Sequence, residues 1–574
     1  MRSYRGRMGF IASGWVGRSG LGRKLSSRRR PVDFEGFPEP ELEGLPDSEL
    51  TRLRYFRQAH SRNFEAHVMS MSLPHTRTET EPIDIEDLRP KRKKLRRGEQ
   101  VEVNITELAS TGEGVAKLDS GMVVFVERGH PGSRVVAEVF NSRKDHAYAK
   151  VISVVNPSEN TIKPICKHYP TCRGCKFQDL KYSAQMHEKH KQVENLFREY
   201  TDIPVFPIIG SDSPFQYRNK MEFTYGTKRY HPDGPPAERP AGDEFILGMN
   251  APRAWDKVIE LDECHLMPEP GTEIFNLARD LTRETKFPAY DNYAHEGFFR
   301  NLVLRFASNG KGETEVMVNI VTSFTDAEQM LKLVAEKLVS KFPCIVSVMH
   351  SMTTSKGGST VAEKQVLLHG RAYIEQRLRG LVFRISSSSF FQPNPGTAEK
   401  LYKVIEDFAE LTPEHTVLDL FCGTGTIGLS LAGSCKHVHG LELVEAAVQD
   451  AENNATRNSI FNATFKQANL DLTKISPHEL DLPKSDVIVL DPPRAGLHPR
   501  LVKWLKLTLP KRIVYASCNP STQVRDVNRL CEDNGPYRLT KIQPVDQFPN
   551  TPHCECVVAL ELREDYKQPS EFYA

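Results

Sequence analysis

Residues 416–428 read Thr-Val-Leu-Asp-Leu-Phe-Cys-Gly-Thr-Gly-Thr-Ile-Gly, and they predict more of the architecture than any other segment of the chain. The first five residues form an apolar run with strand character, and an apolar helix pattern begins at Leu429. Glycine allows a backbone to turn sharply and to approach a ligand at the amino end of a helix. The segment therefore predicts a strand, a ligand-binding loop and a helix, in that order.

Three further apolar runs show the same order of strand and then helix. They lie at 438–442, 487–490 and 513–516, and helical segments separate them. Strands that alternate with helices favour an α/β fold with a parallel, doubly wound, Rossmann-like sheet. Ligands of such sheets bind at the carboxyl ends of the strands, so we expect a binding site where these runs end.

The glycine-rich loop does not identify its ligand alone, because nicotinamide enzymes share the pattern with S-adenosylmethionine enzymes. Glu442, which ends the second strand, can accept hydrogen bonds from the ribose of either cofactor. Two features favour S-adenosylmethionine. Asp419 precedes the first glycine by four residues, where it can fix the loop or meet the amino acid moiety. The third strand ends in Asp491-Pro492-Pro493-Arg494, which is not typical of a dehydrogenase.

The fourth strand leads to a candidate nucleophile. Enzymes that methylate exocyclic amines carry an aromatic residue where Arg494 stands, so a carbon target is favoured here. Cys518 follows the strand at 513–516 and is expected at the same sheet edge as the cofactor loop. A thiolate that adds to C6 of uracil makes C5 electron-rich enough to accept a methyl group. A base must then remove the C5 proton, and Glu555, which opens the strand-like run at 557–560, is the candidate. Carboxylates often act as bases near neutral pH where a desolvated pocket raises their pKa.

Four of the eleven cysteines have spacing typical of a metal site. Cys166, Cys172 and Cys175 form a C-x5-C-x2-C pattern, and Cys264 follows much later. Four thiolates suit a tetrahedral zinc ion or an iron–sulfur cluster. Zinc sites favour two C-x2-C pairs, so this spacing favours iron–sulfur, with zinc as the alternative. Radical enzymes that use S-adenosylmethionine have a different spacing, so we expect a structural or RNA-positioning role.

The rest of the chain divides into three predicted parts and the catalytic sheet at 385–574. Residues 1–90 are expected to be a disordered leader and linker, and their first 30 residues hold eight arginines and no acidic residue, as in a transit peptide or a solvated basic tail. Residues 91–156 alternate as in a small, all-β, OB-like barrel, which either binds RNA or is a structural module. Residues 157–384 read as a mixed α+β central domain.

Composition alone restricts the function little. The chain has 76 Lys and Arg and 74 Asp and Glu, so its net charge of +2 identifies no partner. No apolar run reaches the roughly 18 residues that a membrane-spanning helix needs. The basic run at 90–97 reads as a nuclear signal or as a phosphate-binding arm. We expect localisation to a mitochondrion or plastid, with nucleus or cytoplasm as the alternative.

Together these motifs resemble the RNA uracil-5-methyltransferase family over roughly residues 95–565. The barrel is similar to the TRAM domain of that family, and the four spaced cysteines are similar to the [4Fe–4S] ligands of its cluster-bearing members. Five short stretches match in the family's order: Tyr217–Met221, Ser389–Asn394, Asp491–Gly496, Ser517–Pro520 and His553–Glu555.

The resemblance implies S-adenosylmethionine-dependent methylation of C5 of uridine in tRNA or rRNA, with Cys518 as nucleophile and Glu555 as proton acceptor. RNA is the implied partner, and we expect neither a membrane nor an obligate protein partner. The alternative is an RNA-binding or folding factor with a degenerate methyltransferase domain, against which the intact Cys518, Glu555 and glycine loop argue. The resemblance also implies five residues that contact the cofactor: Gln392, Phe421, Glu442, Asn469 and Asp491.

Overall fold

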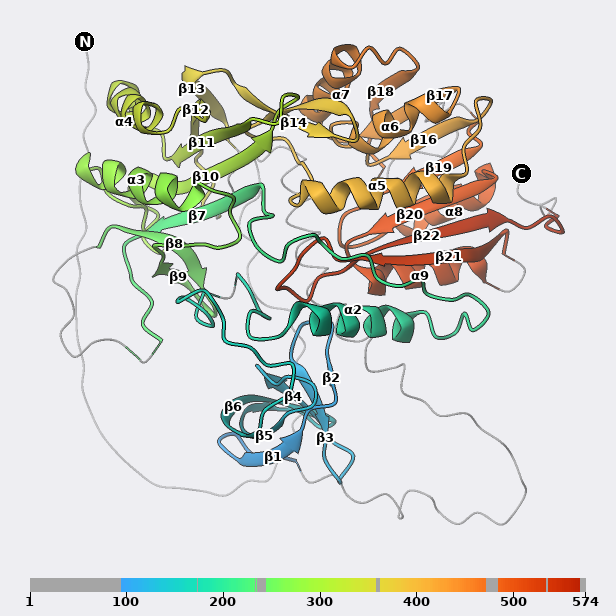
Figure 1. Cartoon of the computed structure of the whole chain (residues 1–574), viewed down its shortest axis with the longest axis horizontal. Coiled ribbons are helices and arrows are strands. Elements are labelled where there is room, and N and C mark those ends of the chain that lie inside the picture. Colours follow the sequence, from blue (N-terminus) through green and yellow to red (C-terminus); the bar gives the residue numbers. More distant parts are fainter. Residues whose placement is uncertain are drawn as a thin grey trace, which may run out of the picture. The chain divides into compact units, whose positions relative to one another are not determined.

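The computed structural model describes most of the chain beyond the predicted leader, which lies outside the described residues. The described residues form three sheets and one separate hairpin (Figure 1). No helix among them is long and apolar enough to span a membrane. The described ranges are 94–172, 174–232, 234, 244–357, 362–470, 484–532 and 535–567.

The first sheet is six-stranded, with the order β1-β5-β6-β4-β3-β2. Its strands alternate between buried and partly exposed residues, as in β4, where Val124 and Val126 are buried. This period of two places one side-chain set in a common aliphatic core. The strands are β1 (Gln100–Asn104), β2 (Glu107–Leu108), β3 (Gly114–Lys117), β4 (Val123–Glu127), β5 (Arg134–Ser142) and β6 (His146–Asn156).

The central sheet has seven strands in the order β13-β12-β11-β10-β7-β8-β9. All its neighbours are antiparallel except β11 and β12, which α4 connects as a crossover. Helices α3 and α4 bury their apolar faces in one hydrophobic cluster with the sheet. The elements are β7 (Lys220–Gly226), β8 (Ile246–Ala251), β9 (Ala254–Glu260), α3 (Gly271–Glu284), β10 (Phe299–Ser308), β11 (Thr314–Thr322), α4 (Glu328–Lys341), β12 (Ile345–Met352) and β13 (Lys364–Gly370), and the hairpin β14 (Tyr373–Leu378) and β15 (Leu381–Ser386) follows.

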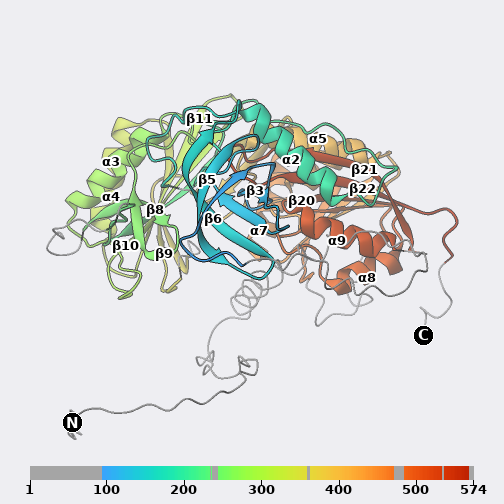
Figure 2. The same ribbon diagram turned by 90° about the horizontal axis from the view of Figure 1, so that it is seen from below.

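The C-terminal sheet is doubly wound, as the strand and helix pattern predicts, and its order is β18-β17-β16-β19-β20-β22-β21. Helix α5 lies on one face of the sheet and α8 and α9 on the other (Figure 2). The elements are α5 (Pro395–Ala409), β16 (Thr416–Leu420), α6 (Thr426–Leu431), a 3₁₀ turn (Ala432–Ser434), β17 (His437–Glu442), α7 (Glu445–Arg457), β18 (Ala463–Gln467), β19 (Val487–Leu490), α8 (Pro499–Thr508), β20 (Arg512–Ser517), α9 (Pro520–Cys531), β21 (Tyr537–Val545) and β22 (Glu555–Leu562).

One strand of this sheet runs against the others. Strand β22 is antiparallel to both of its neighbours, β20 and β21. The amino end of β22 therefore lies at the edge where the parallel strands have their carboxyl ends. A residue that begins β22 can meet residues that follow β16, β19 and β20.

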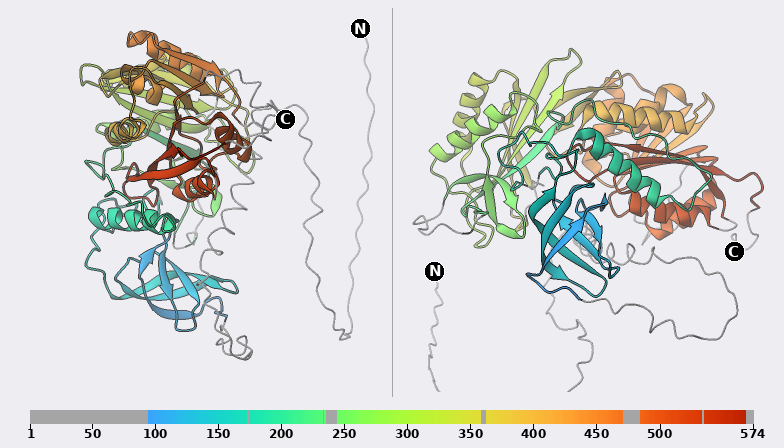
Figure 3. Two further views of the ribbon diagram at one scale, coloured as in Figure 1. Left: turned by 90° about the vertical axis from the view of Figure 1, so that its right-hand side faces the viewer. Right: turned by 60° about the horizontal axis from the view of Figure 1, so that its bottom comes forward.

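Helix α2 (Tyr182–Leu196) lies between the first sheet and the C-terminal sheet (Figure 3). On one side, Glu188 Oε2 accepts a hydrogen bond of 2.9 Å from the backbone N–H of Leu108. On the other side, Val193 is buried in the same hydrophobic cluster as Val527 of α9 and Ile542 of β21. The helix thus holds the barrel against the doubly wound sheet.

Candidate active site

Cys518 and Glu555 lie opposite each other at the edge of the C-terminal sheet. The last paired residues of β20 and β22 are Ser517 and Cys556, so the next residue on each strand places Cys518 across from Glu555. Opposed residues of neighbouring strands are close enough for their side chains to interact. Glu555 is buried and Cys518 is partly exposed, which leaves the thiol accessible to a substrate.

The ionisation of this pair depends on burial and on two neighbours, Asp491 and Arg494. Burial raises the pKa of Glu555 to about 8; Asp491 adds to this effect and Arg494 opposes it. Burial also raises the pKa of Cys518 to about 12, with further increases from Glu555 and Asp491. The Arg494 side chain hydrogen-bonds the thiol and lowers its pKa. Burial raises the pKa of Asp491 itself to about 7. The site is thus rich in carboxyl groups and contains one cation.

The glycine-rich loop is shaped by local backbone conformation and by Glu442. Phe421 has a φ of 66° and Gly425 a φ of 79°, so the chain turns through the left-handed region at both positions. Glu442 Oε2 accepts a hydrogen bond of 3.1 Å from the N–H of Gly423, and Oε1 accepts one of 3.0 Å from the N–H of Val444. Glu442 therefore holds the loop beside the end of β17.

Asp419 fixes the glycine loop, which is one of the two roles that its position predicted. Its Oδ2 atom accepts a hydrogen bond of 2.9 Å from the backbone N–H of Gly428. Its Oδ1 atom is buried and has no hydrogen-bond partner among the described residues. Burial raises the pKa of Asp419 to about 8. A buried, unsatisfied oxygen at a ligand-binding loop is a reason to expect a donor group from a ligand there.

Two predicted cofactor residues lie at other places on the rim of the sheet. Gln392 is buried, and its Oε1 accepts a hydrogen bond of 3.3 Å from Gln547 Nε2. Of the two aromatic residues that precede Gln392, Phe391 is buried in the core and Phe390 is largely exposed. Asn469 is exposed and follows β18, at the same carboxyl edge as the glycine loop.

The loop at 546–550, which the sequence does not reveal as part of the site, is anchored to α2 just before Glu555. Lys189 of α2 and Asp546 form a buried ion pair of 2.6 Å between Nζ and Oδ1. Gln185 Oε1 accepts a hydrogen bond of 2.8 Å from the N–H of Asn550, and Gln185 Nε2 donates to Asn550 Oδ1 at 3.1 Å. The polar sequence of α2 gives little signal for these buried contacts. The helix thereby anchors residues 546–550, just before the base.

His553 belongs to the same loop and packs as an ordinary histidine. Its ring lies edge-on to Phe548, with centroids 6.1 Å apart and planes at 80°. Burial, followed by the charge of Arg494, lowers the pKa of His553 to about 4. The imidazole is therefore neutral at physiological pH.

The four spaced cysteines line one small cavity, so the fold brings Cys264 to the other three. Among the described residues, no three Cys, His, Asp or Glu side chains are grouped as ligands of a single metal ion. The loop that follows Cys175 contacts the loop before Glu555. The backbone N–H groups of Lys176 and Phe177 both donate to the carbonyl of Asn550, at 2.7 and 3.2 Å.

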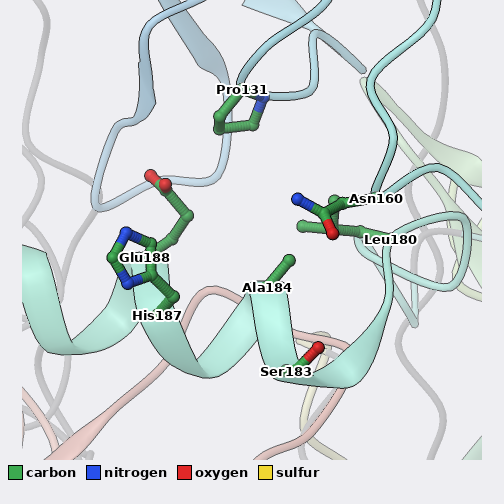
Figure 4. A pocket seen from close by; sticks show the side chains of 7 residues that line it. All are labelled: Pro131, Asn160, Leu180, Ser183, Ala184, His187 and Glu188. Atoms are coloured by element: carbon green, nitrogen blue, oxygen red, sulfur yellow. The ribbon is translucent and has the colours of Figure 1, made fainter.

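A separate pocket lies between the barrel and α2 (Figure 4). It contains no cysteine, and none of the predicted site residues lines it. The candidate catalytic residues therefore lie at the edge of the C-terminal sheet and not in this pocket. The pocket is lined by Pro131, Asn160, Leu180, Ser183, Ala184, His187 and Glu188.

Two family models match the chain. The model for tRNA (uracil-5-)-methyltransferases matches residues 358–563, and the TRAM domain model matches residues 94–152. An uncharacterized RNA methyltransferase of Chlorobaculum tepidum is 36% identical over 493 residues, which cover 84% of this chain and 99% of the relative. One of Clostridium tetani is 36% identical over 475 residues, with coverage of 82% and 99%.

A solved structure shows the same similarity. The chain is similar to the Pyrococcus abyssi tRNA (uracil-54, C5)-methyltransferase, whose structure contains S-adenosyl-L-homocysteine. The TM-score is 0.61 and the identity 28%, over 80% of this chain and 100% of the other. These matches agree with the geometry of the sheet edge. The chain belongs to the tRNA (uracil-5-)-methyltransferase family and is an RNA (uracil-5-)-methyltransferase.

Proposed function

We propose that this enzyme methylates C5 of a uridine in a folded tRNA or rRNA through a covalent bond between Cys518 and C6 of the base. The observation that carries the proposal is the register of β20 and β22, which sets Cys518 across from Glu555. A nucleophile and a base at one edge, beside the glycine loop, are what C5 methylation requires.

The proposed reaction begins when the Cys518 thiolate attacks C6. A C–S bond forms, and the C5–C6 electron pair moves into an enolate that is nucleophilic at C5. S-adenosylmethionine, when bound, would supply an electrophilic methyl group to C5; its S–CH3 bond would break and the thioether S-adenosylhomocysteine would be the leaving group. The Glu555 carboxylate then removes the proton from C5, the C5–C6 double bond re-forms, and Cys518 leaves as a thiolate.

Arg494 is proposed to assist the first step. A partly buried thiol beside two carboxyl groups resists ionisation, and the pKa of Cys518 is accordingly raised to about 12. The Arg494 guanidinium opposes this increase because it stabilises the negative sulfur through charge and a hydrogen bond. A cation at this position of the Asp491-Pro492-Pro493-Arg494 segment thus suits a thiolate mechanism.

The residues at the sheet edge fit S-adenosylmethionine. The donor carries a positive sulfonium and an ammonium group, and the carboxyl groups of Asp491 and Asp419 lie where the strands end. The Oδ1 atom of Asp419 is an acceptor without a partner in the part of the chain that the structure describes. We propose that the donor is held by Gln392, Phe421, Glu442, Asn469 and Asp491.

We propose a [4Fe–4S] cluster, with zinc as the alternative, at Cys166, Cys172, Cys175 and Cys264. The donor set fits, since four thiols line one cavity. The cluster is preferred to zinc because the set contains only one C-x2-C pair, whereas zinc sites favour two. Its proposed role is to fix the loop that contacts Asn550.

The test is to map 5-methyluridine across tRNA and rRNA from cells with and without this protein. A uridine that loses its methyl group only in the deletion strain is the expected result. Wild-type protein should restore the modification, and the Cys518→Ala variant should bind RNA but not restore it. Persistent 5-methyluridine formation by Cys518→Ala would contradict the mechanism.

A further inference from the structure

Trp255 and Tyr293 form an exposed, stacked pair of aromatic rings on the central domain. The exposed fraction is 62% for Trp255 and 71% for Tyr293. Their ring centroids lie 6.3 Å apart, and the ring planes meet at 27°. Large aromatic residues gain most from burial, so two of them side by side in solvent indicate a surface that a ligand covers.

The turn that carries Tyr293 is held in place before any ligand binds. Asp291 Oδ1 accepts hydrogen bonds from the backbone N–H groups of Tyr293 and Ala294, at 2.6 and 3.0 Å. Asp291 Oδ2 accepts one of 3.0 Å from the Thr227 hydroxyl. These bonds fix the turn that carries the ring. A preorganised turn loses less conformational freedom when its side chain binds a partner.

Positive groups flank the aromatic pair. Lys228 Nζ lies 5.2 Å from the centroid of the Tyr293 ring, and it pairs with Asp291 Oδ2 at 3.2 Å. Lys257 follows Trp255 by two residues in β9, which is the edge strand of the central sheet. Rings interleaved with cations are typical of surfaces that bind unpaired nucleotides, because the rings stack on bases and the cations attract phosphates.

The pair is adjacent to the TRAM barrel. Arg253, which directly precedes β9, pairs with Glu127 of β4 at 2.5 Å. Its guanidinium also lies 4.8 Å from the centroid of the Phe140 ring of β5. Strand β9 and the barrel strands accordingly lie side by side in Figure 2. One RNA strand can therefore contact the barrel and the aromatic pair together.

We propose that Trp255 and Tyr293 form a stacking platform for unpaired nucleotides of the substrate RNA that lie outside the target uridine. The identity of the ligand as RNA rests on the proposed function. Stacking on a ring tolerates any base, so the platform adds affinity for single-stranded segments and does not select the methylated base. It distinguishes unpaired RNA from duplex RNA.

The experiment measures the Kd of the full chain for a mixed-sequence single-stranded RNA and for a duplex of the same sequence. The Trp255→Ala and Tyr293→Ala variants should bind the single strand about fivefold to 150-fold more weakly, with little change for the duplex. Trp255→Phe and Tyr293→Phe, which keep a ring, should bind nearly as well as the wild type. Phe461→Ala, which removes an 85%-exposed ring from the C-terminal domain, is the matched control and should have no effect.

Two outcomes would overturn the platform. An unchanged single-strand Kd in the double alanine variant would assign the pair to another partner, such as a protein. An equal loss for single strand and duplex would indicate a general defect and not stacking. The Kd measurement needs no turnover, so it tests the platform separately from the proposed function. Absence of 5-methyluridine formation would refute the proposed function but would leave the preference for single-stranded RNA unchanged.

Discussion

The Nζ atom of Lys189 lies 2.6 Å from Oδ1 of Asp546, and the two side chains are 1% and 0% exposed. Replacing Lys189 with Met leaves a buried carboxylate without its cation, which is expected to lower the free energy of unfolding by about 3–5 kcal/mol. Urea denaturation measures the change. Lys191→Met on the same helix removes an exposed pair with Glu107 and should cost only about 0–1 kcal/mol. Equal effects of the two substitutions would contradict the buried pair's role.

The cysteine loop and the loop before Glu555 share backbone hydrogen bonds through Asn550. Cys175→Ser is expected to lower the iron content of anaerobically purified protein and to speed amide hydrogen exchange in residues 546–554. Cys344→Ser, at a cysteine outside the set, should change neither. Loss of iron with unchanged exchange would show that the loops are independent. If the wild-type protein contained stoichiometric zinc and neither iron nor sulfide, the site would be assigned to zinc and not to a cluster.

Glu555→Gln is expected to trap the reaction after methyl transfer. The amide cannot accept the C5 proton, so the bond between Cys518 and C6 persists and turnover falls by about 10²–10⁴-fold. The adduct is visible as a slowly migrating band of labelled RNA on a denaturing gel. The band should be absent in the double variant that carries both Glu555→Gln and Cys518→Ala. Turnover at the wild-type rate in Glu555→Gln would exclude this carboxylate as the base.

Arg494→Ala should make Cys518 less reactive. The guanidinium lowers the pKa of the thiol, so its removal raises the pKa and decreases the thiolate fraction at any pH. The rate of Cys518 alkylation by iodoacetamide, followed by peptide mass spectrometry, is expected to fall, and its pH profile should shift upward. Arg494→Lys keeps the charge and should recover part of the rate. An unchanged profile in Arg494→Ala would remove Arg494 from the mechanism.

The reaction is expected to accelerate with rising pH. Burial raises the pKa of Glu555 to about 8, so about one tenth of this group is ionised at pH 7. Because the base acts as a carboxylate, kcat/KM, which reports on the free enzyme, should rise at least about tenfold between pH 7 and pH 9. Ionisation of Cys518 adds to the increase. A profile that falls above pH 7 would contradict these assignments.

The strands and the glycine loop were predictable because their signals are local. The apolar runs at 416–420, 438–442, 487–490 and 513–516 all lie within observed strands. The reversed direction of β22 has no local signal, because it depends on how the final hairpin pairs. The sequence suggested that Cys518 and Glu555 work together, but only the register explains why they meet.

The supporting contacts were not predictable, for a different reason. Lys189 and Gln185 lie in a helix whose sequence, Tyr-Ser-Ala-Gln-Met-His-Glu-Lys-His-Lys-Gln, looks like a solvated face. Their burial arises because the barrel and the C-terminal sheet enclose the helix from two sides.

The order of β20, β21 and β22 along the chain also sets the order in which a growing chain becomes competent. The ribosome makes the donor-binding segments first, then Cys518, and only afterwards Glu555. A nascent chain can therefore present its thiol before it can resolve a bond to RNA. Glu555 joins the sheet only when β22 has been made and pairs with β20, so the residue that releases the RNA is the last part of the site to be completed.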